Sequence, residues 1–281
     1  MIPPEPKGAS MRPGPVKVLT INVKAFQGSD GGTVDTKALD AIERYIEKTD
    51  ADVVLFQELD NGTARSGRSD QLADISRRVG ANDSQFAKAL DHDGGAYGVG
   101  MLTRNGYSIR DAAGGGNATS RVELPKSSAK GADGEQRVAL VAPIVAPDGS
   151  QFTAVSTHLA NKGPGRSAQV RGLQAIVDDA HGGARNRAAG LRDDLPTSVV
   201  LGGDFNTQRG PIEGILHGVS HVATQSTVGD TNIDHIYVSS DVQVHDAQLD
   251  DPEVIRGHWE PWKRDVRATD HPALLATLQL R

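Results

Sequence analysis

Short apolar runs and amphipathic segments are interspersed along the whole chain. Runs rich in Val, Ile, Leu and Phe that are bounded by turn residues are typical of β-strands, and apolar positions three and four residues apart predict helices. We expect strands at 17–23, 52–56, 98–103, 107–110, 137–145, 152–157, 198–201, 236–239 and 273–279. We expect helices at 35–48, from Ser69 as the N-cap to Gly80, at 167–180 and, as a short helix, from Pro211 onward.

The order of these elements favours one mixed structure. Strands and helices do not strictly alternate, which disfavours a pure parallel barrel. Residues 112–134 are rich in Gly, Ser and Ala and are expected to form a long loop after a pair of strands at 98–103 and 107–110. Neither a repeat nor a linker divides the chain. We therefore expect one domain over residues 16–281, of the α/β (α+β) class, with a mixed two-sheet core and outer helices.

Residues 1–15 differ from the rest because they are polar and rich in Pro and Gly. They contain no apolar segment of the kind that an intact signal peptide needs. We expect a flexible leader, a processed mature end or an expression remnant there.

Composition narrows the class of protein. Of the 281 residues 37% are hydrophobic and 23% are charged, so a packed core is feasible. The net charge of −6, without basic blocks, argues against a protein that coats DNA by charge alone, although a nuclease with a local basic rim or a bound metal fits it. The chain has no cysteine, which excludes disulfide scaffolds, thiolate metal sites and Cys nucleophiles. No apolar run reaches the ~20 residues that span a bilayer, so we expect no stable membrane insertion.

Polar residues stand at the ends of the expected strands. Some follow a strand, and others come just before one. If the last two strands run antiparallel to the others, the starts of these two meet the ends of the others at one edge. The residues that would then form a single rim are Asn22, Glu58, His158, Asp204, Asn206, Asp234, Asp270 and His271.

Such a rim would hold several carboxylates close together, and their charges repel one another. A divalent cation relieves that repulsion, and hard oxygen ligands suit Mg²⁺, with Mn²⁺ as the alternative. The sequence contains no HExxH motif or similar His-rich spacing, which makes a zinc site the less favoured choice.

Six segments along the chain also carry a family resemblance. They are Thr20-Ile21-Asn22, Gln57-Glu58, Thr157-His158-Leu159, Gly203-Asp204-Phe205-Asn206, Ile233-Asp234 and Thr269-Asp270-His271. In this order, from about Val16 to Leu280, they resemble the endonuclease/exonuclease/phosphatase superfamily, whose members include deoxyribonucleases, abasic-site endonucleases, inositol-polyphosphate phosphatases and sphingomyelinases. The resemblance implies a four-layer α/β/β/α sandwich of two mixed sheets flanked by helices, and metal-dependent phosphoester hydrolysis.

Three positions depart from the family pattern. Abasic-site endonucleases carry an acid where this chain has Lys24, which argues against abasic-site specificity. Val99 stands where related sequences often carry Asn, and Thr269 stands where Ser is commoner.

The resemblance implies a role for each rim residue. Glu58 is expected to bind the metal, with Asn22 supporting the metal ligands or a phosphate oxygen and Asp270 joining the metal shell. Asp204 is expected to orient and deprotonate the attacking water, and Asn206 to hold the phosphate or that water. The alternative for this loop is a simple Asx turn.

The two rim histidines are expected to contact non-bridging phosphate oxygens. Either His158 or His271 can stabilise the transition state or protonate the leaving oxygen. Asp234 can hydrogen-bond His271 and raise its basicity. His235 adjoins Asp234 but is expected to point the other way along its strand.

Five further residues are candidates for substrate binding. Arg68, Tyr97 and Arg104 either line the substrate side or serve packing and surface pairing. Trp259 and Trp262 lie beside basic residues and either stack on bases, enter a lipid interface or anchor a loop by burial.

The leading hypothesis is a Mg²⁺-dependent phosphodiesterase or nuclease-type hydrolase. The alternatives are a phosphomonoesterase acting on inositol or sugar phosphates, a sphingomyelinase-like lipid phosphodiesterase and a non-catalytic binding module of the same fold. The expected partner is a phosphoester: a nucleic acid, a phospholipid head group or a small phosphate ester. We expect a monomer, and similarity to bacterial sequences favours an extracellular location.

Overall fold

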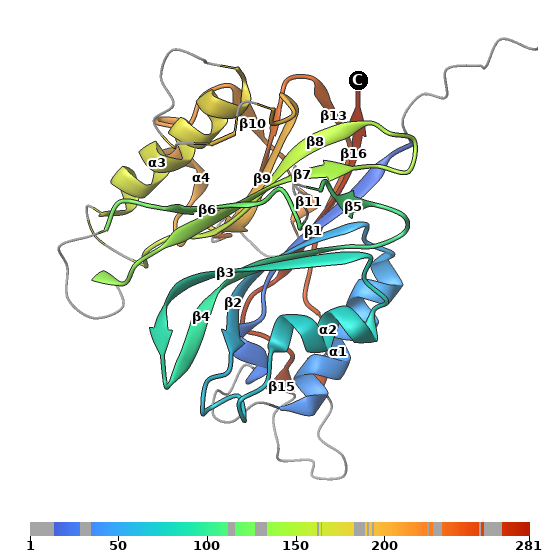
Figure 1. Cartoon of the computed structure of the whole chain (residues 1–281), viewed down its shortest axis with the longest axis vertical. Coiled ribbons are helices and arrows are strands. Elements are labelled where there is room, and N and C mark those ends of the chain that lie inside the picture. The colour runs from blue at the N-terminus through green and yellow to red at the C-terminus, as the bar shows by residue number, and fades with distance from the viewer. Residues whose placement is uncertain are drawn as a thin grey trace, which may run out of the picture.

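Two seven-stranded sheets form the centre of the molecule (Figure 1). The computed structural model describes residues 14–28, 35–111, 116–126, 134–161, 163, 165–182, 189, 191–192, 194–223, 225–226, 232–252, 254–255 and 266–281. The first sheet has the order β11-β13-β16-β1-β2-β4-β3. Its strands are β1 (Val16–Asn22), β2 (Val53–Asn61), β3 (Asp83–His92), β4 (Gly95–Thr103), β11 (Gln225–Ser226), β13 (Val242–Asp250) and β16 (Ala273–Leu280).

The second sheet has the order β10-β12-β9-β8-β7-β5, and β6 also pairs with β7. Its strands are β5 (Ser108–Ile109), β6 (Ser120–Glu123), β7 (Val138–Val145), β8 (Gln151–His158), β9 (Val199–Asp204), β10 (Val219–His221) and β12 (Asp234–Ser239). A separate pair consists of β14 (Val254–Ile255) and β15 (Val266–Arg267).

Helices cover the outer face of each sheet (Figure 1). α1 (Thr36–Thr49) and α2 (Gln71–Arg78) pack on the first sheet, and α3 (Gly165–Ala180) and α4 (Arg209–Glu213) pack on the second. A short helical turn, η1 (Lys24–Phe26), follows β1. The molecule is therefore the expected α/β/β/α sandwich of two mixed sheets.

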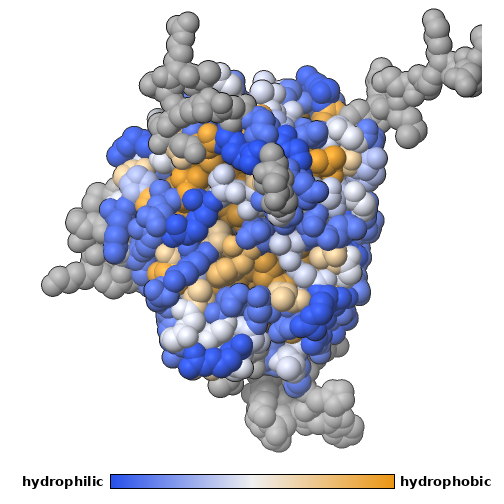
Figure 2. Space-filling view, in the orientation of Figure 1, coloured by the Kyte–Doolittle hydropathy of each residue, from blue (hydrophilic) through white to orange (hydrophobic). Residues whose placement is uncertain are grey.

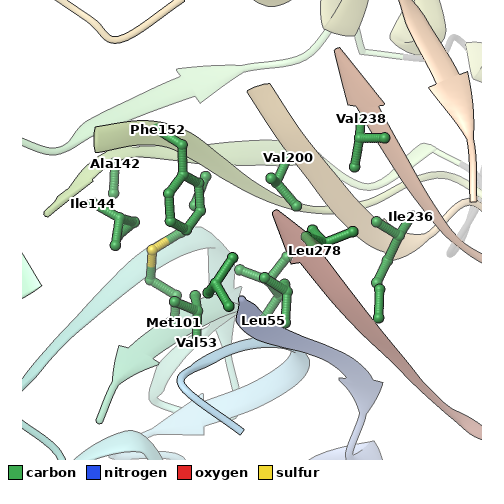
Figure 3. Close-up of a cluster of buried hydrophobic side chains, with 14 of the residues drawn as sticks. Val53, Leu55, Met101, Ala142, Ile144, Phe152, Val200, Ile236, Val238 and Leu278 are labelled. Atoms are coloured by element: carbon green, nitrogen blue, oxygen red, sulfur yellow. The ribbon is translucent and has the colours of Figure 1, made fainter. Parts of the chain in front are cut away.

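Successive side chains of a strand point to opposite faces of its sheet. One set packs in the core between the two sheets, and the other packs against the helices in an outer core. In β2, Val53 and Leu55 belong to the core between the sheets, whereas Val54 and Phe56 pack with the helices outside. Each fully buried side chain of this size contributes roughly 1.5–3 kcal/mol. Figure 3 shows the two sheets meeting through Val53, Leu55, Met101, Phe152, Val200 and Ile236.

The directions of the strands determine which strand ends lie next to one another. β1 and β2 run parallel, with Asn22 opposite Gln57, and β8 and β9 run parallel, with His158 opposite Asp204. β16 is antiparallel to β1, and β12 is antiparallel to β9, with Asp234 opposite Asp204. The starts of β12 and β16 therefore lie at the ends of their neighbours, as the rim hypothesis required.

Several expected elements need correction. The strands expected as a pair lie in different sheets, because β4 pairs with β2 and β3, whereas β5 pairs with β7. The expected loop at 112–134 contains β6, whose partner is β7. The short strands β10, β11, β14 and β15 were not expected, and neither were the two long strands β3 and β13. Both long strands carry several charged and partly exposed residues, so backbone pairing with β4 and β16 defines them rather than an apolar run.

Several helix starts also differ from the expectation, and α3 begins at Gly165 instead of residue 167. The N-cap of α2 is Asp70, whose side chain accepts a hydrogen bond from the Ala73 N–H, rather than Ser69. α4 begins at Arg209, so Pro211 is its third residue. Gly80 stops α2 as expected, since it has a φ of +63°.

The surface is mainly hydrophilic with some apolar residues showing through. On the face in Figure 2, hydrophobic residues are visible in the middle of the molecule between hydrophilic ones. Among the described residues, Val244 is the one large hydrophobic side chain that is exposed, at 39%. Within the same described part, no helix has the length and apolar character needed to cross a membrane.

Close approach of β9 to β8 requires glycine at position 203. A Cβ atom there would lie 2.0 Å from the Thr157 carbonyl oxygen, which belongs to the backbone and cannot move aside. We expect Gly203→Ala to lower the free energy of unfolding by about 2 kcal/mol, as overpacking does. Urea unfolding measures this change.

Gly210→Ala is the matched control, because a Cβ at Gly210 meets nothing within 4 Å. We expect it to change the free energy of unfolding by less than about 0.5 kcal/mol. Equal stability of Gly203→Ala and the wild type would contradict the close approach of the two strands.

Candidate active site

Asn22 joins acids from both sheets at the end of β1. Its side-chain NH₂ group donates to Glu58 Oε1 and to Asp204 Oδ2, each at 3.0 Å. Its Oδ1 accepts the Lys24 N–H at 3.0 Å, which fixes the orientation of the amide. The amide therefore faces the acids as a donor and holds them side by side.

A β-bulge turns Glu58 towards the rim. Phe56 pairs with Gly100 and Leu59 with Gly98, so two residues of β2 lie opposite one residue of β4. Glu58 has a φ of +58°, which is uncommon for a residue other than glycine. Leu59 returns to the outer core, so the bulge redirects Glu58 without disturbing the packing beyond it.

The end of β9 uses both oxygens of Asp204. Oδ1 accepts the Asn206 N–H at 2.8 Å and closes an Asx turn, in which Asn206 has a φ of +52°. Oδ2 faces the rim, 3.4 Å from His158 Nε2 and 3.7 Å from His271 Nε2. One oxygen of this buried carboxylate therefore closes the Asx turn, and the other oxygen faces the rim.

The loop after β9 is held in place from a third element. Arg166, in α3, donates to the backbone carbonyls of Asn161, at 2.8 Å, and of Asn206. Asn206 Nδ2 donates to the Leu159 carbonyl at 2.9 Å and lies 3.0 Å from His158 Nε2. These contacts fix the side chain of Asn206 at the rim.

His271 and Asp234 form a buried pair. His271 Nδ1 lies 2.9 Å from Asp234 Oδ2, and Asp234 is completely buried. Burial opposes a charge on His271, but the hydrogen bond and charge of Asp234, with the charges of Asp204 and Asp270, outweigh it and raise the pKa of His271 to about 9. The expected contact between these two residues is present.

His158 has a different neighbour. Its Nδ1 lies 3.1 Å from Nη1 of Arg137, and both side chains are buried. Burial first, and then the positive charge of Arg137, hold the pKa of His158 well below its ordinary value. The two rim histidines thus have opposite electrostatic surroundings.

Three rim acids, Glu58, Asp204 and Asp234, have raised pKa values. Burial raises the pKa of Glu58, and burial with the charge of Asp234 raises the pKa of Asp204 to about 6. Burial also raises the pKa of Asp234, whose Oδ1 has no hydrogen-bond partner among the described residues. This donor set fits a bound cation, because a cation would neutralise the crowded carboxylates.

Two groups of side chains can offer ligand atoms to one ion. Glu58, His158 and Asp204 form the first group, and Asp204, Asp234 and His271 form the second, with the ligand atoms of each group within 4.8 Å of one another. Asp270 belongs to neither group. Its carboxylate is 46% exposed and pairs with Lys24 Nζ at 2.7 Å.

Lys24 reaches this position from a strained turn. Lys24, Ala25 and Phe26 all have φ values near +50°, in the left-handed region. The Gln71 side chain donates to the Ala25 carbonyl at 2.7 Å and supports the turn. A cation therefore stands at the position where abasic-site endonucleases carry an acid.

The rim opens into a cleft of about 440 Å³. Its walls include Arg65, Tyr97, Glu135 and Arg137, together with six of the rim residues: Glu58, His158, Asp204, Asn206, Asp270 and His271. The Arg65 guanidinium pairs with Asp60 at 2.6 Å and lies 5.7 Å from the centre of the Tyr97 ring. Arg65 thus lines the cleft while its charge is paired with Asp60.

The candidates for substrate binding have different positions. Tyr97 lines the cleft, whereas Arg68 donates to the carbonyls of Gly62 and Gly94 outside it. Arg104 follows the carboxyl end of β4, which is antiparallel to β2, so it lies at the opposite end of the sheet and binds backbone carbonyls there. Trp259 and Trp262 lie outside the described residues.

His235 points away from the rim, as expected. Its Nε2 lies 2.9 Å from the Thr207 carbonyl oxygen, and its Nδ1 lies 3.0 Å from His221 Nε2. It supports the loop after Asp204 from behind.

The other two departures from the family pattern have simple explanations. The Thr269 hydroxyl donates to the Asn22 carbonyl at 2.7 Å and accepts the His271 N–H at 3.3 Å, which a Ser hydroxyl in its place would also do. Val99 is buried in the core between the sheets.

Arg137, Arg65 and Glu135 line the cleft but were not expected there. Arg137 comes directly before β7, which is antiparallel to β8, so its position beside His158 follows the same rule that places Asp234 and Asp270. The sequence signal that could have identified Arg137 is a polar residue directly before an antiparallel strand. Arg65 and Glu135 stand in connecting segments, where no such signal exists.

Comparison with known proteins agrees with this geometry. A family model described as "Endonuclease/Exonuclease/phosphatase family" matches residues 19–271. No curated protein gives a significant sequence match.

Solved structures share the fold. A protein of this family from Bacteroides thetaiotaomicron has a TM-score of 0.72 at 16% identity, covering 96% of this chain and 99% of that one. The mannosyl-6-phosphatase of the same organism has a TM-score of 0.69 at 16% identity, covering 94% and 99%. The human Nocturnin catalytic domain with bound sulfate has a TM-score of 0.65 at 16% identity, covering 96% and 95%.

The contacts of Glu58 and Asp270 predict that these two acids contribute unequally to metal binding. Glu58 lies with Asp204 in a group of converging ligand atoms, whereas Asp270 is exposed and paired with Lys24. We expect Glu58→Gln to weaken binding of Mg²⁺ or Mn²⁺ at least ~10-fold, equivalent to about 1.4 kcal/mol. Asp270→Asn serves as the comparison and is expected to weaken it less than ~3-fold, as exposed pairs do. Isothermal titration calorimetry measures both, and an equal loss in the two variants would contradict this assignment.

Proposed function

The chain belongs to the endonuclease/exonuclease/phosphatase family of phosphoester hydrolases, and we propose that it is a phosphodiesterase-type member that uses Mg²⁺, or Mn²⁺ in its place. The observation that carries the proposal is the position of Asp204 Oδ2. It lies 3.0 Å from Asn22 Nδ2 and within 4 Å of both rim histidines. One buried carboxylate oxygen thus stands at the centre of the groups that hydrolysis of a phosphoester needs.

Asp204 is the general base of the proposed reaction. Its pKa, raised to about 6 by burial and by Asp234, is high enough to accept a proton and low enough to leave the carboxylate ionised near neutral pH. The Asx turn to Asn206 and the hydrogen bond from Asn22 fix its direction. It takes a proton from the attacking water.

His271 and Asn206 complete the set on the substrate side. The imidazole of His271, held by Asp234 at Nδ1, presents Nε2 to the cleft and can donate a proton to the leaving oxygen. Asn206, with its side chain fixed by Leu159, holds the phosphate or the water. Together with Asp204 they provide one proton acceptor and one proton donor for the hydrolysis.

Glu58 would hold the divalent cation, with Asn22 orienting its carboxylate. When bound, such a cation neutralises charge on the phosphate and on the leaving oxygen. The carboxylate oxygens of Glu58 are hard ligands, which favours Mg²⁺ over softer ions.

Loss of the proposed base or acid is expected to stop the reaction without unfolding the protein. We expect Asp204→Asn and His271→Ala each to lower kcat at least ~100-fold, a typical size for loss of an acid–base group. His245→Ala is the control, because His245 is exposed on β13 and lies outside the cleft. Near-normal kcat in folded Asp204→Asn protein would refute the role of Asp204.

A second candidate function is hydrolysis of a small phosphomonoester, such as a sugar or inositol phosphate. The observation that favours it is the size of the cleft, since about 440 Å³ suits a small ligand. The similar fold of a mannosyl-6-phosphatase is consistent with this candidate.

Paired substrates separate the two candidates. We expect bis-aryl phosphate to be hydrolysed with a higher kcat/KM than mono-aryl phosphate, in a reaction that EDTA abolishes and Mg²⁺ restores. Plasmid DNA, RNA, sphingomyelin and inositol phosphates, assayed with Mg²⁺, then identify the substrate class. A preference for the mono-aryl ester would favour the second candidate, and full turnover in metal-free buffer would contradict both.

A further inference from the structure

The cleft extends beyond the residues proposed for hydrolysis. In the first sheet β4 and β3 follow β2, and in the second sheet β7 follows β8. At about 4.8 Å per strand, the space between the start of β4 and the start of β7 lies roughly 10 Å from Asn22 and Asp204. We call this space the far end of the cleft. It is lined by Arg65, Leu90, His92, Tyr97, Glu135 and Arg137.

Arg65 is held at the far end from three sides. Its Nε and Nη2 donate to the two oxygens of Asp60 at 2.6 and 2.8 Å, and the Asp60 side chain is completely buried. Its backbone N–H donates to Asp93 Oδ2 at 2.7 Å, and its guanidinium lies 5.7 Å from the centre of the Tyr97 ring. A bidentate pair of this kind fixes the plane of the guanidinium. The side chain of Arg65 is therefore preorganised before any ligand binds.

The pairing with Asp60 leaves one nitrogen of Arg65 available. Nη1 forms no hydrogen bond within the described part of the chain, and the side chain is 29% exposed in the wall of the cleft. Its N–H bonds are donors. Just before β7, the carboxylate of Glu135 pairs with Arg137 at 3.2 Å, and the Glu135 side chain is 37% exposed. The far end thus offers both a donor and an acceptor to a ligand.

The two guanidinium groups of the far end carry compensated charges. Asp60 neutralises Arg65, and Glu135 neutralises Arg137. A second phosphate or a carboxylate would lose its hydration here without gaining a guanidinium that is free of its own carboxylate. An ammonium group would meet the Arg65 guanidinium over the Tyr97 ring, a place where aromatic rings otherwise attract cations. The electrostatics therefore disfavour a charged substituent of either sign.

The polar groups of the far end match a hydroxyl-bearing ligand, because a hydroxyl both donates and accepts and carries no charge. Leu90 and Tyr97 add carbon surface beside the polar groups, a combination that is usual in sites for small ligands. We propose that the far end is a subsite for a neutral, polyhydroxylated substituent of the substrate, and that Arg65 is the residue that determines this specificity.

The subsite narrows the substrate class. With the phosphate at the rim, the step that rests on the proposed function, the substituent that extends past Glu58 towards Arg65 is a polyol or a sugar. Phosphoesters with a cationic head group fit less well, because the Arg65 guanidinium repels their charge.

Non-hydrolysable phosphonates test the subsite through binding alone. Isothermal titration calorimetry of the full chain with Mg²⁺ compares dihydroxybutylphosphonate with butylphosphonate, which lacks only the two hydroxyl groups. We expect the diol to bind at least ~10-fold more tightly, the size of effect expected for hydrogen bonds to charged groups. Carboxypropylphosphonate and trimethylammoniopropylphosphonate should bind no more tightly than butylphosphonate. Equal binding of the diol and butylphosphonate, no binding of the diol, or tighter binding of a charged analogue would overturn the proposal.

Variants of the ion pair test the role of Arg65. Arg65→Met alone would leave Asp60 as a buried charge without its partner, so both residues are replaced together in Asp60→Asn/Arg65→Met. We expect this variant to bind the diol and butylphosphonate equally, with the affinity for butylphosphonate unchanged. Arg77→Met is the matched control, because Arg77 also pairs with an aspartate but is 75% exposed on α2, outside the cleft. It should keep the full preference for the diol.

The outcomes separate this proposal from the proposed function. Tighter binding of the diol by a protein that hydrolyses no phosphoester would support the subsite and refute the function. Hydrolysis of phosphoesters by a protein that binds the diol and butylphosphonate equally would refute the subsite alone. A preference for the diol that persists in folded Asp60→Asn/Arg65→Met would refute the role of Arg65. If that variant does not fold, the four phosphonates with the wild-type protein still decide whether the subsite exists.

Discussion

Mutual repulsion of carboxylates packed close together is the constraint on which the candidate active site depends. Glu58, from the first sheet, meets Asp204 and Asp234, from the second, where the sheets converge. Their pKa values are raised because burial and neighbouring charge disfavour ionisation. Hydrogen bonds from Asn22 and the charge of His271 reduce this cost only in part, so the site favours a bound cation.

Strand direction explains why much of this site could be predicted from the sequence. Apolar runs in the sequence predicted β1, β2, β8 and β9. The polar residues at the ends of these strands predicted that one edge of the molecule carries the site. The antiparallel starts of β12 and β16 then brought Asp234 and His271 to the same place. The prediction needed only the direction of each strand and the position of the polar residue relative to it.

Other features depend on contacts that have no local signal. The β-bulge that redirects Glu58 becomes visible only when β2 is paired with β4. Strands β3 and β13 are polar and exist because a neighbour pairs with them. Arg104 directly follows an expected strand, yet the antiparallel course of β4 carries it to the opposite end of the sheet. In each case tertiary pairing overrode local sequence pattern.

The two rim histidines have opposite electrostatic surroundings, although the side chain is the same. Both stand at strand termini and both face Asp204, so position alone does not distinguish them. What differs is the atom behind the ring: a carboxylate oxygen of Asp234 for His271 and a guanidinium nitrogen of Arg137 for His158. The carboxylate of Asp234 raises the pKa of His271, whereas burial and the charge of Arg137 lower the pKa of His158. Arg137, the residue before β7, therefore sets the electrostatic surroundings of His158 as Asp234 sets those of His271.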